Sequence, residues 1–513
     1  MHRSNAITRT LKAKSIQQLF CFPLTPTLLA LTVAGSIFCP NPWPAVAAES
    51  TTPIKVGLRK QLMVDDYLIA RRTGLTRALG KATKLNDGKP VIVVDQPWET
   101  NVGFYGTVLH DSEKFQMWYR IHRHPWALGY AESVDGLNWR KPNLGLVWMN
   151  GSKENNIINT QWGWTFTCFL DLHETDPAHR YKACYGDRRK ARACLAHSPD
   201  GIHWTPYNGG EPVTSRAADT CNQLLWDSDA KVYRLFTRTD FGTNAGAGEI
   251  RGTRGMTNPD IKENPTNWTT VRSWKFDREG AEEPKRRQIY QLTDWIYEGV
   301  HFALLFVFEW PDDLSEGGHD LYKRHERNVL TFYIATSRDA DDWDLSWVYA
   351  EKPLVPRGPD GSFDKDWVQP SSTFITHNDQ HWIYYAGSKE RHGMSPYEQS
   401  IGIAAFRLDG IVFLEAADER ATLLTRPFVL EGKDLEINAA ARSGEMTVEI
   451  LDAAGKPIPG FTRAEAEPLD GKDGLRLRPR WSSRSPGSLK GRTIRLHFTL
   501  KNASLYAFRV TEE

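Results

Sequence analysis

The 513-residue chain lacks an excess of charge of either sign. Lys and Arg together number 64, Asp and Glu number 63, and the formal net charge is +1. A protein that binds nucleic acid needs a clustered basic surface, and this composition supplies no such excess. We therefore expect no nucleic-acid partner.

Cysteine is scarce, and its spacing does not suit a metal. Six cysteines are present, without a Cys-x-x-Cys pair or a His/Cys cluster that would indicate zinc. We expect no metal site and no cofactor. A Gly-x-Ser-x-Gly phrase is also missing, which argues against a serine hydrolase. For Cys184 and Cys194, buried free thiols and a disulfide bridge are the alternatives.

A long hydrophobic run is confined to the N-terminus. A basic start is followed by an apolar stretch at Leu28–Ala34 and by the small residues Ala45–Ala48. This order is typical of a secretory signal peptide, which we assign to residues 1–48. An uncleaved anchor is the alternative, but Pro23, Pro26 and Gly35 interrupt the run. We expect an exported protein, periplasmic or extracellular, with no membrane contact after cleavage.

Long helical periodicity is absent, and a short phrase recurs instead. It stands at Tyr130–Trp139, Leu195–Trp204 and Ile334–Trp343, with degenerate copies at Met256–Asp260 and Ala405–Gly410. In each full copy a strand-like stretch leads into a Ser-x-Asp turn and a Trp. We interpret the phrase as structural, with the Trp filling space between neighbouring sheets.

The spacing of these phrases predicts the architecture. Their aspartates lie at positions 135, 200, 260, 339 and 409. A repeat of this length, made of strands, is typical of one four-stranded sheet per unit arranged radially. We predict an all-β, five-bladed β-propeller over residues 49–420, with blade boundaries near residues 150, 210, 275 and 350. Among the expected first strands of blades are Phe166–Leu170 and Ser372–Thr376.

After Ala421 the pattern changes to short alternating stretches. Met446–Leu451 and Leu505–Val510 alternate apolar and polar residues between short turns. Alternation of this kind indicates half-buried antiparallel strands. We predict a small C-terminal β-sandwich over residues 421–513.

A resemblance to a known family rests on six phrases: Leu62–Ile69, Met117–Tyr119, Tyr130–Trp139, Asn155–Ile157, Ser337–Asp339 and Leu505–Phe508. In these phrases the chain resembles exported bacterial proteins that are similar to the invertase-type (family 32) and arabinanase-type (family 43) glycoside hydrolases. The resemblance implies a five-bladed propeller that acts on carbohydrate. The three catalytic phrases of the invertase type, Trp-Met-Asn-Asp-Pro, Arg-Asp-Pro and Glu-Cys, do not occur here. No catalytic residue is carried over.

Candidate catalytic residues follow from propeller geometry. First strands begin at one mouth of the central channel, and the loops after second strands reach the same mouth. Glycoside hydrolysis needs two carboxyl groups there, one to protonate the leaving oxygen and one to attack or to activate water. We predict Asp219, Glu99 and Glu283. A loop-capping role is the alternative for Asp219, and a solvated loop position is the alternative for Glu99. The outer loops add Asp187, Asp240, Glu309 and Glu390.

The same mouth is rich in aromatic residues and cations. Aromatic rings stack on the apolar faces of sugars, and arginines suit sulfated or uronic-acid sugars through paired hydrogen bonds. Pairing with the mouth carboxylates is the alternative for the arginines. The predicted substrate-binding residues are Tyr105, Arg120, Asp187, Arg188, Arg238, Tyr290, Trp367 and His392.

Two kinds of function fit these features. The first is an exported glycoside hydrolase that acts on a plant or algal glycan at the channel mouth. The second is a glycan-binding propeller without catalysis. A propeller phosphorylase would use the arginines for phosphate, but a secretion signal argues against it.

Overall fold

The described residues of the computed structural model fold almost entirely into β-strands. They span residues 52–512, apart from 112, 122–125, 163–164, 188–190, 216, 218–219, 244–247, 278–286, 311–327, 394–397 and 483. The short helix α3 (Ser346–Tyr349) and a few 3-10 turns accompany the strands. The all-β class is confirmed. The predicted signal peptide lies outside the described residues. Within them, no helix has the length and apolar character needed to cross a membrane.

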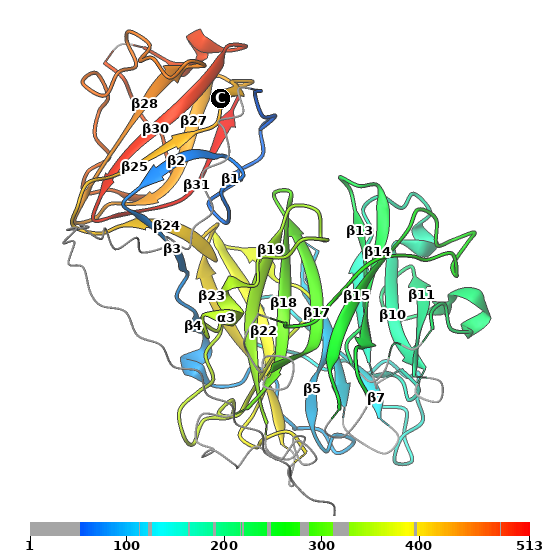
Figure 1. Ribbon diagram of the computed structural model, residues 1–513. Coiled ribbons are helices and arrows are strands. Elements are labelled where there is room, and N and C mark those ends of the chain that lie inside the picture. The colour runs from blue at the N-terminus through cyan, green and yellow to red at the C-terminus, as the bar shows by residue number, and fades with distance from the viewer. Residues whose placement is uncertain are drawn as a thin grey trace, which may run out of the picture. The chain divides into compact units, whose positions relative to one another are not determined.

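Three antiparallel four-stranded sheets follow one another along the chain (Figure 1). Sheet I comprises β5 (Val102–His110), β6 (Phe115–Ile121), β7 (Ala127–Ser133) and β8 (Ile157–Asn159). Sheet II comprises β9 (Phe166–Leu170), β10 (Tyr181–Asp187), β11 (Arg192–Ser198) and β12 (Thr205–Pro206). Sheet III comprises β13 (Gln223–Asp227), β14 (Val232–Asp240), β15 (Arg251–Asn258) and β16 (Thr269–Trp274). In each sheet the strands pair in chain order.

An eight-stranded sheet follows, made of two parts joined by a single parallel residue pair, Leu330 with Trp367. Sheet IV comprises β17 (Arg287–Tyr297), β18 (Val300–Glu309) and β19 (Val329–Ser337). Sheet V comprises β20 (Trp367–Pro370), β21 (Ile375–His377), β22 (Gln380–Ser388), β23 (Gln399–Arg407) and the N-terminal strand β4 (Thr83–Lys84). The outermost strand of sheet V therefore comes from the start of the described chain.

One predicted strand is wrong. Residues 372–376 were expected to form a single first strand, but β20 ends at Pro370 and β21 begins at Ile375. Between them the Ser372 amide donates to the Gly106 carbonyl of β5, at 3.0 Å. The backbone leaves β22 at this point to bond with sheet I, so the pairing within sheet V is interrupted.

The five sheets contact one another in a closed order. β5 lies against β9, β9 against β13 and β13 against β17. Sheet IV then meets sheet V where β18 and β19 contact β20, and β22 and β23 of sheet V return to β5. Buried polar side chains tie these strands together. We call them the polar axis: Thr107, Thr167, Gln223, Gln291, Gln369 and Ser372.

The bonds of the polar axis cross between sheets. Thr107 Oγ1 lies 2.6 Å from Ser372 Oγ. The Gln223 Nε2 donates to the carbonyls of Asp294 at 2.8 Å and Ser372 at 3.0 Å. Buried amides and hydroxyls need such partners, because an unpaired one loses its water without compensation. The axis is therefore both buried and polar.

The recurring Ser-x-Asp phrase forms the same turn in its three full copies. In the first copy, Asp135 Oδ1 accepts from the amides of Leu137 at 2.9 Å and Asn138 at 2.8 Å. Asp200 and Asp339 accept equivalent bonds. Trp139 packs edge-on against Tyr384 of sheet V, whose hydroxyl donates to the turn at 2.7 Å. The structural role predicted for the phrase is confirmed, because Tyr384 of a neighbouring sheet packs against the turn and hydrogen-bonds to it.

Two further sheets combine both ends of the described chain. Sheet VI comprises β2 (Ile69–Thr73), β25 (Ala421–Thr425), β26 (Phe428–Val429), β28 (Glu445–Asp452) and β30 (Thr493–Lys501). Sheet VII comprises β1 (Gln61–Leu62), β3 (Leu75–Leu79), β24 (Val412–Ala416), β27 (Asp434–Ala440), β29 (Asp473–Leu477) and β31 (Ala503–Thr511). The strand pairing thus does not follow the predicted division at residue 420, since β1, β2, β3 and β24 precede it.

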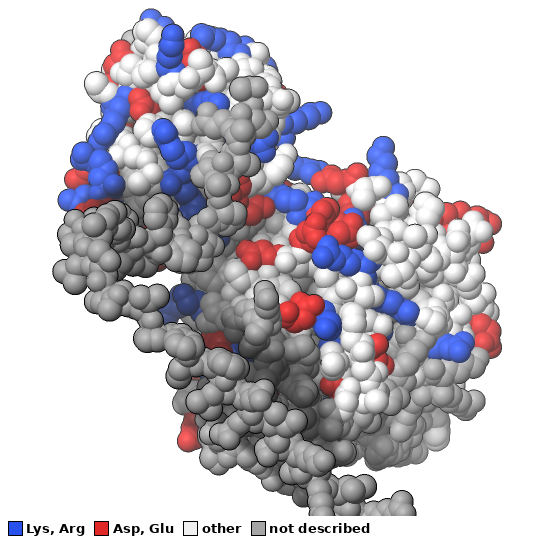
Figure 2. All heavy atoms as spheres, viewed as in Figure 1, with Lys and Arg blue, Asp and Glu red and all other residues white. Residues whose placement is uncertain are grey.

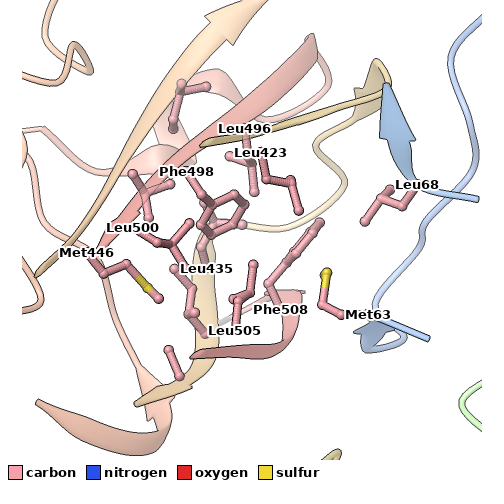
Figure 3. Close-up of a cluster of buried hydrophobic side chains, with 14 of the residues drawn as sticks. Met63, Leu68, Leu423, Leu435, Met446, Leu496, Phe498, Leu500, Leu505 and Phe508 are labelled. Carbon is pink, nitrogen blue, oxygen red and sulfur yellow. The ribbon is translucent and has the colours of Figure 1, made fainter. Parts of the chain in front are cut away.

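Sheets VI and VII enclose one apolar core (Figure 3). Leu423, Phe498 and Leu500 of sheet VI meet Leu435 and Phe508 of sheet VII, and each of these side chains is almost completely buried. The alternation explains this core, since every second residue of β28 and β30 turns inward, and β31 alternates on either side of a register shift between Leu505 and Ala507.

The four described cysteines, Cys168, Cys184, Cys194 and Cys221, are buried free thiols. Cys184 of β10 pairs with Leu195, and Cys194 of β11 pairs with Tyr185. A shift of one residue along a strand turns a side chain to the other face. Cys184 and Cys194 therefore point to opposite faces of sheet II, which prevents a bridge.

Candidate functional site

Aromatic side chains from three sheets meet near the starts of the first strands. Tyr105 of β5 stacks with Tyr290 of β17 at 6.5 Å between ring centroids. Trp367 of β20 stacks with His392 at 5.5 Å, and Phe308 of β18 lies 5.3 Å from the same histidine. The Tyr290 hydroxyl lies 3.4 Å from His392 Nε2. We call these five residues the aromatic cluster.

Register shifts in strand pairing point the side chains of Tyr105 and Tyr290 toward the aromatic cluster. The register between β17 and β18 shifts between Ile289 and Gln291, so Tyr290 is the extra residue of a bulge. The register between β5 and β6 shifts between Gly103 and Thr107, a stretch that contains Tyr105. Bulges re-aim side chains in this way and are frequent beside active sites.

Two arginines lie over the rings of the aromatic cluster. The Arg251 guanidinium lies 4.9 Å from the centre of the Tyr290 ring and 5.2 Å from that of Phe308. The Arg120 guanidinium lies 4.6 Å from the centre of the Tyr105 ring and 5.2 Å from that of Trp126. Cations favour this position because the ring faces carry negative potential.

Most described cations around the cluster are held by carboxylates. Glu249 accepts from Arg251 at 2.7 Å and from Arg238 at 3.2 Å, and Asp240 accepts from Arg238 at 2.9 Å. Asp366, one residue before Trp367, pairs with Lys365 at 3.0 Å and lies 3.7 Å from Arg391. These ion pairs hold the side chains around the aromatic cluster in place. They also engage the oxygens of Glu249, Asp240 and Asp366, which a catalytic carboxylate would need free.

Glu309, the last residue of β18, is a different kind of carboxylate. Burial raises its pKa above the usual 4.5, and the positive charge of Arg287 opposes that rise only in part. Its carboxylate accepts from Arg287 Nε at 3.1 Å and from the Tyr333 hydroxyl at 3.2 Å. It borders a polar cavity of about 390 Å³ that Arg357 and Lys365 also line. A carboxyl with a raised pKa beside a cavity is suited to act as a general acid.

Of the predicted catalytic residues, the structure describes Glu99 alone. Asp219 and Glu283 lie outside the described residues. The Glu99 carboxylate accepts from the Tyr119 hydroxyl at 2.8 Å, from Lys141 Nζ at 2.7 Å and from the Asp95 amide at 3.2 Å. Its side chain is fully buried. These contacts correct the solvated position considered for Glu99 and favour a structural role, while its catalytic role stays a prediction.

The predicted substrate-binding residues are largely brought together. Tyr105, Tyr290, Trp367 and His392 form most of the aromatic cluster, Arg120 contacts it, and Arg238 is linked to it through Glu249 and Arg251. Arg188 and the Asp187 side chain lie outside the described parts of the chain. The sequence did not single out Trp126, Arg251, Phe308 or Gln399, because their role depends on bulges and on contacts between distant strands.

A larger cavity lies at the opposite ends of the first strands. It measures about 820 Å³, and Leu172, Trp226, Trp295 and Ile296 line part of it. Its walls are mostly apolar, with Asp171, His173, Ser228 and Lys231 as the polar lining residues. The aromatic cluster combines rings with cations, which makes it the candidate site, and four of its rings, those of Tyr105, Tyr290, Phe308 and Trp367, are buried.

The described residues contain no group of three or more His, Cys, Asp or Glu side chains placed to hold a metal ion. Figure 2 shows acidic and basic side chains interspersed over the visible face, in keeping with the net charge of +1.

No family model matches the chain, and no curated protein matches it. Solved structures are similar to part of it. An N-acetylgalactosamine deacetylase from F. plautii, in complex with blood group B trisaccharide, is 14% identical, covering 66% of this chain and 97% of that chain at a TM-score of 0.42. The catalytic domain of the Coprinopsis cinerea GH62 α-L-arabinofuranosidase is 11% identical, covering 64% and 97% at 0.41. A thermostable family-43 glycoside hydrolase is 13% identical, covering 62% and 94% at 0.39. At these TM-scores the likeness supports no conclusion about activity.

Proposed function

We propose that sheets I to V are the five blades of a β-propeller and that sheets VI and VII form a β-sandwich. The closed order of contacts among sheets I to V supports the propeller, as does the completion of sheet V by the N-terminal strand β4. The shared apolar core of sheets VI and VII supports the sandwich.

The protein acts, in this proposal, on a plant or algal glycan at the channel mouth where the first strands begin. The observation that carries the proposal is the aromatic cluster with its two arginines. Stacked rings bind the apolar C–H faces of sugars, and the arginines supply hydrogen bonds that fix the orientation of a sugar. Three sheets contribute to the cluster, so the site depends on the complete ring.

The proposed reaction is hydrolysis of an O-glycosyl bond, which needs an acid and a nucleophile or base. Asp219, Glu99 and Glu283 remain the candidates from the sequence, and Glu309 is the described carboxyl whose pKa suits an acid. A glycan-binding protein without catalysis is the second candidate function. The ion pairs of Glu249, Asp240 and Asp366 favour it, because paired carboxylates are poor nucleophiles.

Glycan binding is tested by array screening followed by calorimetry with the best ligand. We expect Trp367→Ala to weaken affinity about tenfold, because a stacking ring is lost. Trp148→Ala is the matched control, since Trp148 is 68% exposed and lies outside the cluster. Absence of binding to every glycan on the array would contradict the proposal.

Catalysis is tested by the release of reducing sugar from the bound glycan. We expect Asp219→Asn or Glu309→Gln to lower turnover by orders of magnitude with little change in melting temperature. Binding without any release of sugar by the unaltered protein would select the non-catalytic alternative.

A mature protein that starts near residue 48, seen by mass spectrometry of exported material, would support the proposed periplasmic or extracellular location.

A further inference from the structure

Arg120 differs from the other described arginines around the site. It is 4% exposed, yet no carboxylate of the described residues pairs with it. Its guanidinium makes a single hydrogen bond there, from Nη2 to Gln399 Oε1 at 3.4 Å, and its buried Nε has no partner. Burying an unpaired charge is costly, so a cation in this state is suited to receive an anion from outside.

The partner of Arg120 adds a second donor at the same place. Gln399 accepts from Arg120 through Oε1, which leaves its Nε2 as a donor, and this buried atom has no partner among the described residues. The backbone amide of Gln399 is held by Asn101 Oδ1. The Arg120–Gln399 pair therefore presents donors without an acceptor.

A glycine makes this arrangement possible. Gly103 lies opposite Arg120 in the β5–β6 register, and a Cβ at this position would collide with Gln399 Oε1. The glycine thus leaves room for the Gln399 side chain, which comes from β23 of sheet V, to reach Arg120 in sheet I. Tyr105 and Trp126 hold the guanidinium between two rings and fix its position.

We propose that the Arg120–Gln399 pair binds the anionic group, a carboxylate or a sulfate, of an acidic sugar that stacks on the aromatic cluster. Both anions accept paired hydrogen bonds from a guanidinium fork. The inference rests on the proposed glycan-binding function and specifies the class of glycan. A neutral sugar would leave the buried charge without a partner.

Calorimetry with three probes of one backbone tests the inference: galactotriose, trigalacturonate and a monosulfated galactotriose. We expect at least one acidic probe to bind about tenfold or more tightly than galactotriose, with an affinity that falls as salt rises. The probe that binds more tightly distinguishes a uronate from a sulfate site. Equal affinity for all three probes overturns the inference but leaves the proposed function standing. If neither acidic probe binds while other glycans bind on the array, the inference is likewise overturned and the proposed function still stands.

Two variants connect the preference to the pair. Arg120→Gln removes the charge, and Gln399→Glu gives Arg120 an internal carboxylate at the position of the present amide. We expect each to abolish the preference for the acidic probe, so that the affinities for the acidic probe and for galactotriose become similar. Gln399→Glu keeps the test decisive if Arg120→Gln fails to fold, since it adds an ion pair. Lys153→Gln, on an exposed loop, is the control with the same charge change as Arg120→Gln. An acidic preference that persists in Gln399→Glu overturns the inference.

Discussion

The polar axis of sheets I to V and the core between sheets VI and VII are both buried, but they are stabilised by different means. The core is built from Leu, Ile, Val, Phe and Met, and its stability comes from burial and packing. The axis is built from Thr, Gln and Ser, and its stability depends on each polar atom finding a partner. One chain thus uses nondirectional packing in one part and directional bonds in another.

The difference between packing in the core and hydrogen bonding in the axis bears on the candidate site. A packed apolar core tolerates substitution of similar volume, whereas a bonded axis holds strands in fixed register. The strands that carry the aromatic cluster belong to the axis. Fixed register there keeps rings from three sheets in stacking distance, which a ligand site requires.

The largest effect is expected in the apolar core. Phe498→Ala removes a completely buried ring that packs against Phe508 at 6.0 Å. We expect the free energy of unfolding to fall by about 3–5 kcal/mol, measured by chemical denaturation. Val271→Ala, at a side chain that is 42% exposed, should change it by less than about 0.5 kcal/mol. Equal losses in the two variants would argue that the core is not packed as described.

A somewhat smaller loss in the free energy of unfolding is expected for a substitution in the polar axis. Gln223→Leu has nearly the volume of the original residue, so packing is kept, but two carbonyls and the Asp294 amide lose their partner. We expect a loss of about 3 kcal/mol in the same measurement, since each unsatisfied buried group costs about 1–3 kcal/mol. Gln161→Leu, at an exposed position, is the control. A neutral Gln223→Leu would remove the distinction between axis and core.

A third prediction uses the pH dependence of a buried pair beside the axis. Burial lowers the pKa of His301, but the charges of Asp294, 2.7 Å from Nδ1, and Asp227 outweigh burial and the opposing Arg234, so the net shift is upward from 6.5. A raised folded-state pKa gives stability that is complete below pH 6.5 and lost as pH rises through the folded value. We expect unfolding free energy measured across this range to decline with pH, and His301→Gln to flatten the decline. An unchanged slope in the variant would contradict this assignment.

The smallest effect is expected in the recurring turns. Asp135→Ala removes the acceptor of the Leu137 and Asn138 amides, and a loss of about 1 kcal/mol is expected, as for a helix cap. Although partial burial opposes it, these bonds lower the pKa of Asp135 below 3.8, so its contribution is present above that pH and is lost under acid. Asp418→Ala, at an exposed site, should show neither effect. Thermal melts at pH 7 and pH 3 would separate the two variants.

Local features of the fold were predictable from the sequence, and distant pairings were not. The Ser-x-Asp turns lie within a few residues of chain, so their bonds follow from the phrase itself. The alternation of Met446–Leu451, within β28, likewise predicted an apolar face. By contrast, β2 pairs with β25 about 350 residues later, and its short sequence carries no signal for that partner.

The same limit applies to the site. Tyr290 and Trp367 were predicted as binding residues from their positions at strand starts, and both belong to one buried cluster. Other partners could not be predicted, because they are distant in the sequence. Lys141 binds Glu99 across 42 positions, and Arg120 pairs with Gln399, rather than with a carboxylate, across 279 positions. Residue type indicates what a side chain can do, and tertiary structure decides which partner it has.

The attachment of β4 to β23 has a consequence for the order of folding. Thr83 pairs with Ala405, so a strand made early during synthesis waits for a partner made more than 300 residues later. Until then β4 has no partner strand, and its edges are open to pairing with another chain. The ring can be completed only after nearly the whole chain has been synthesised, which makes slow, all-or-none maturation the expected behaviour of this protein.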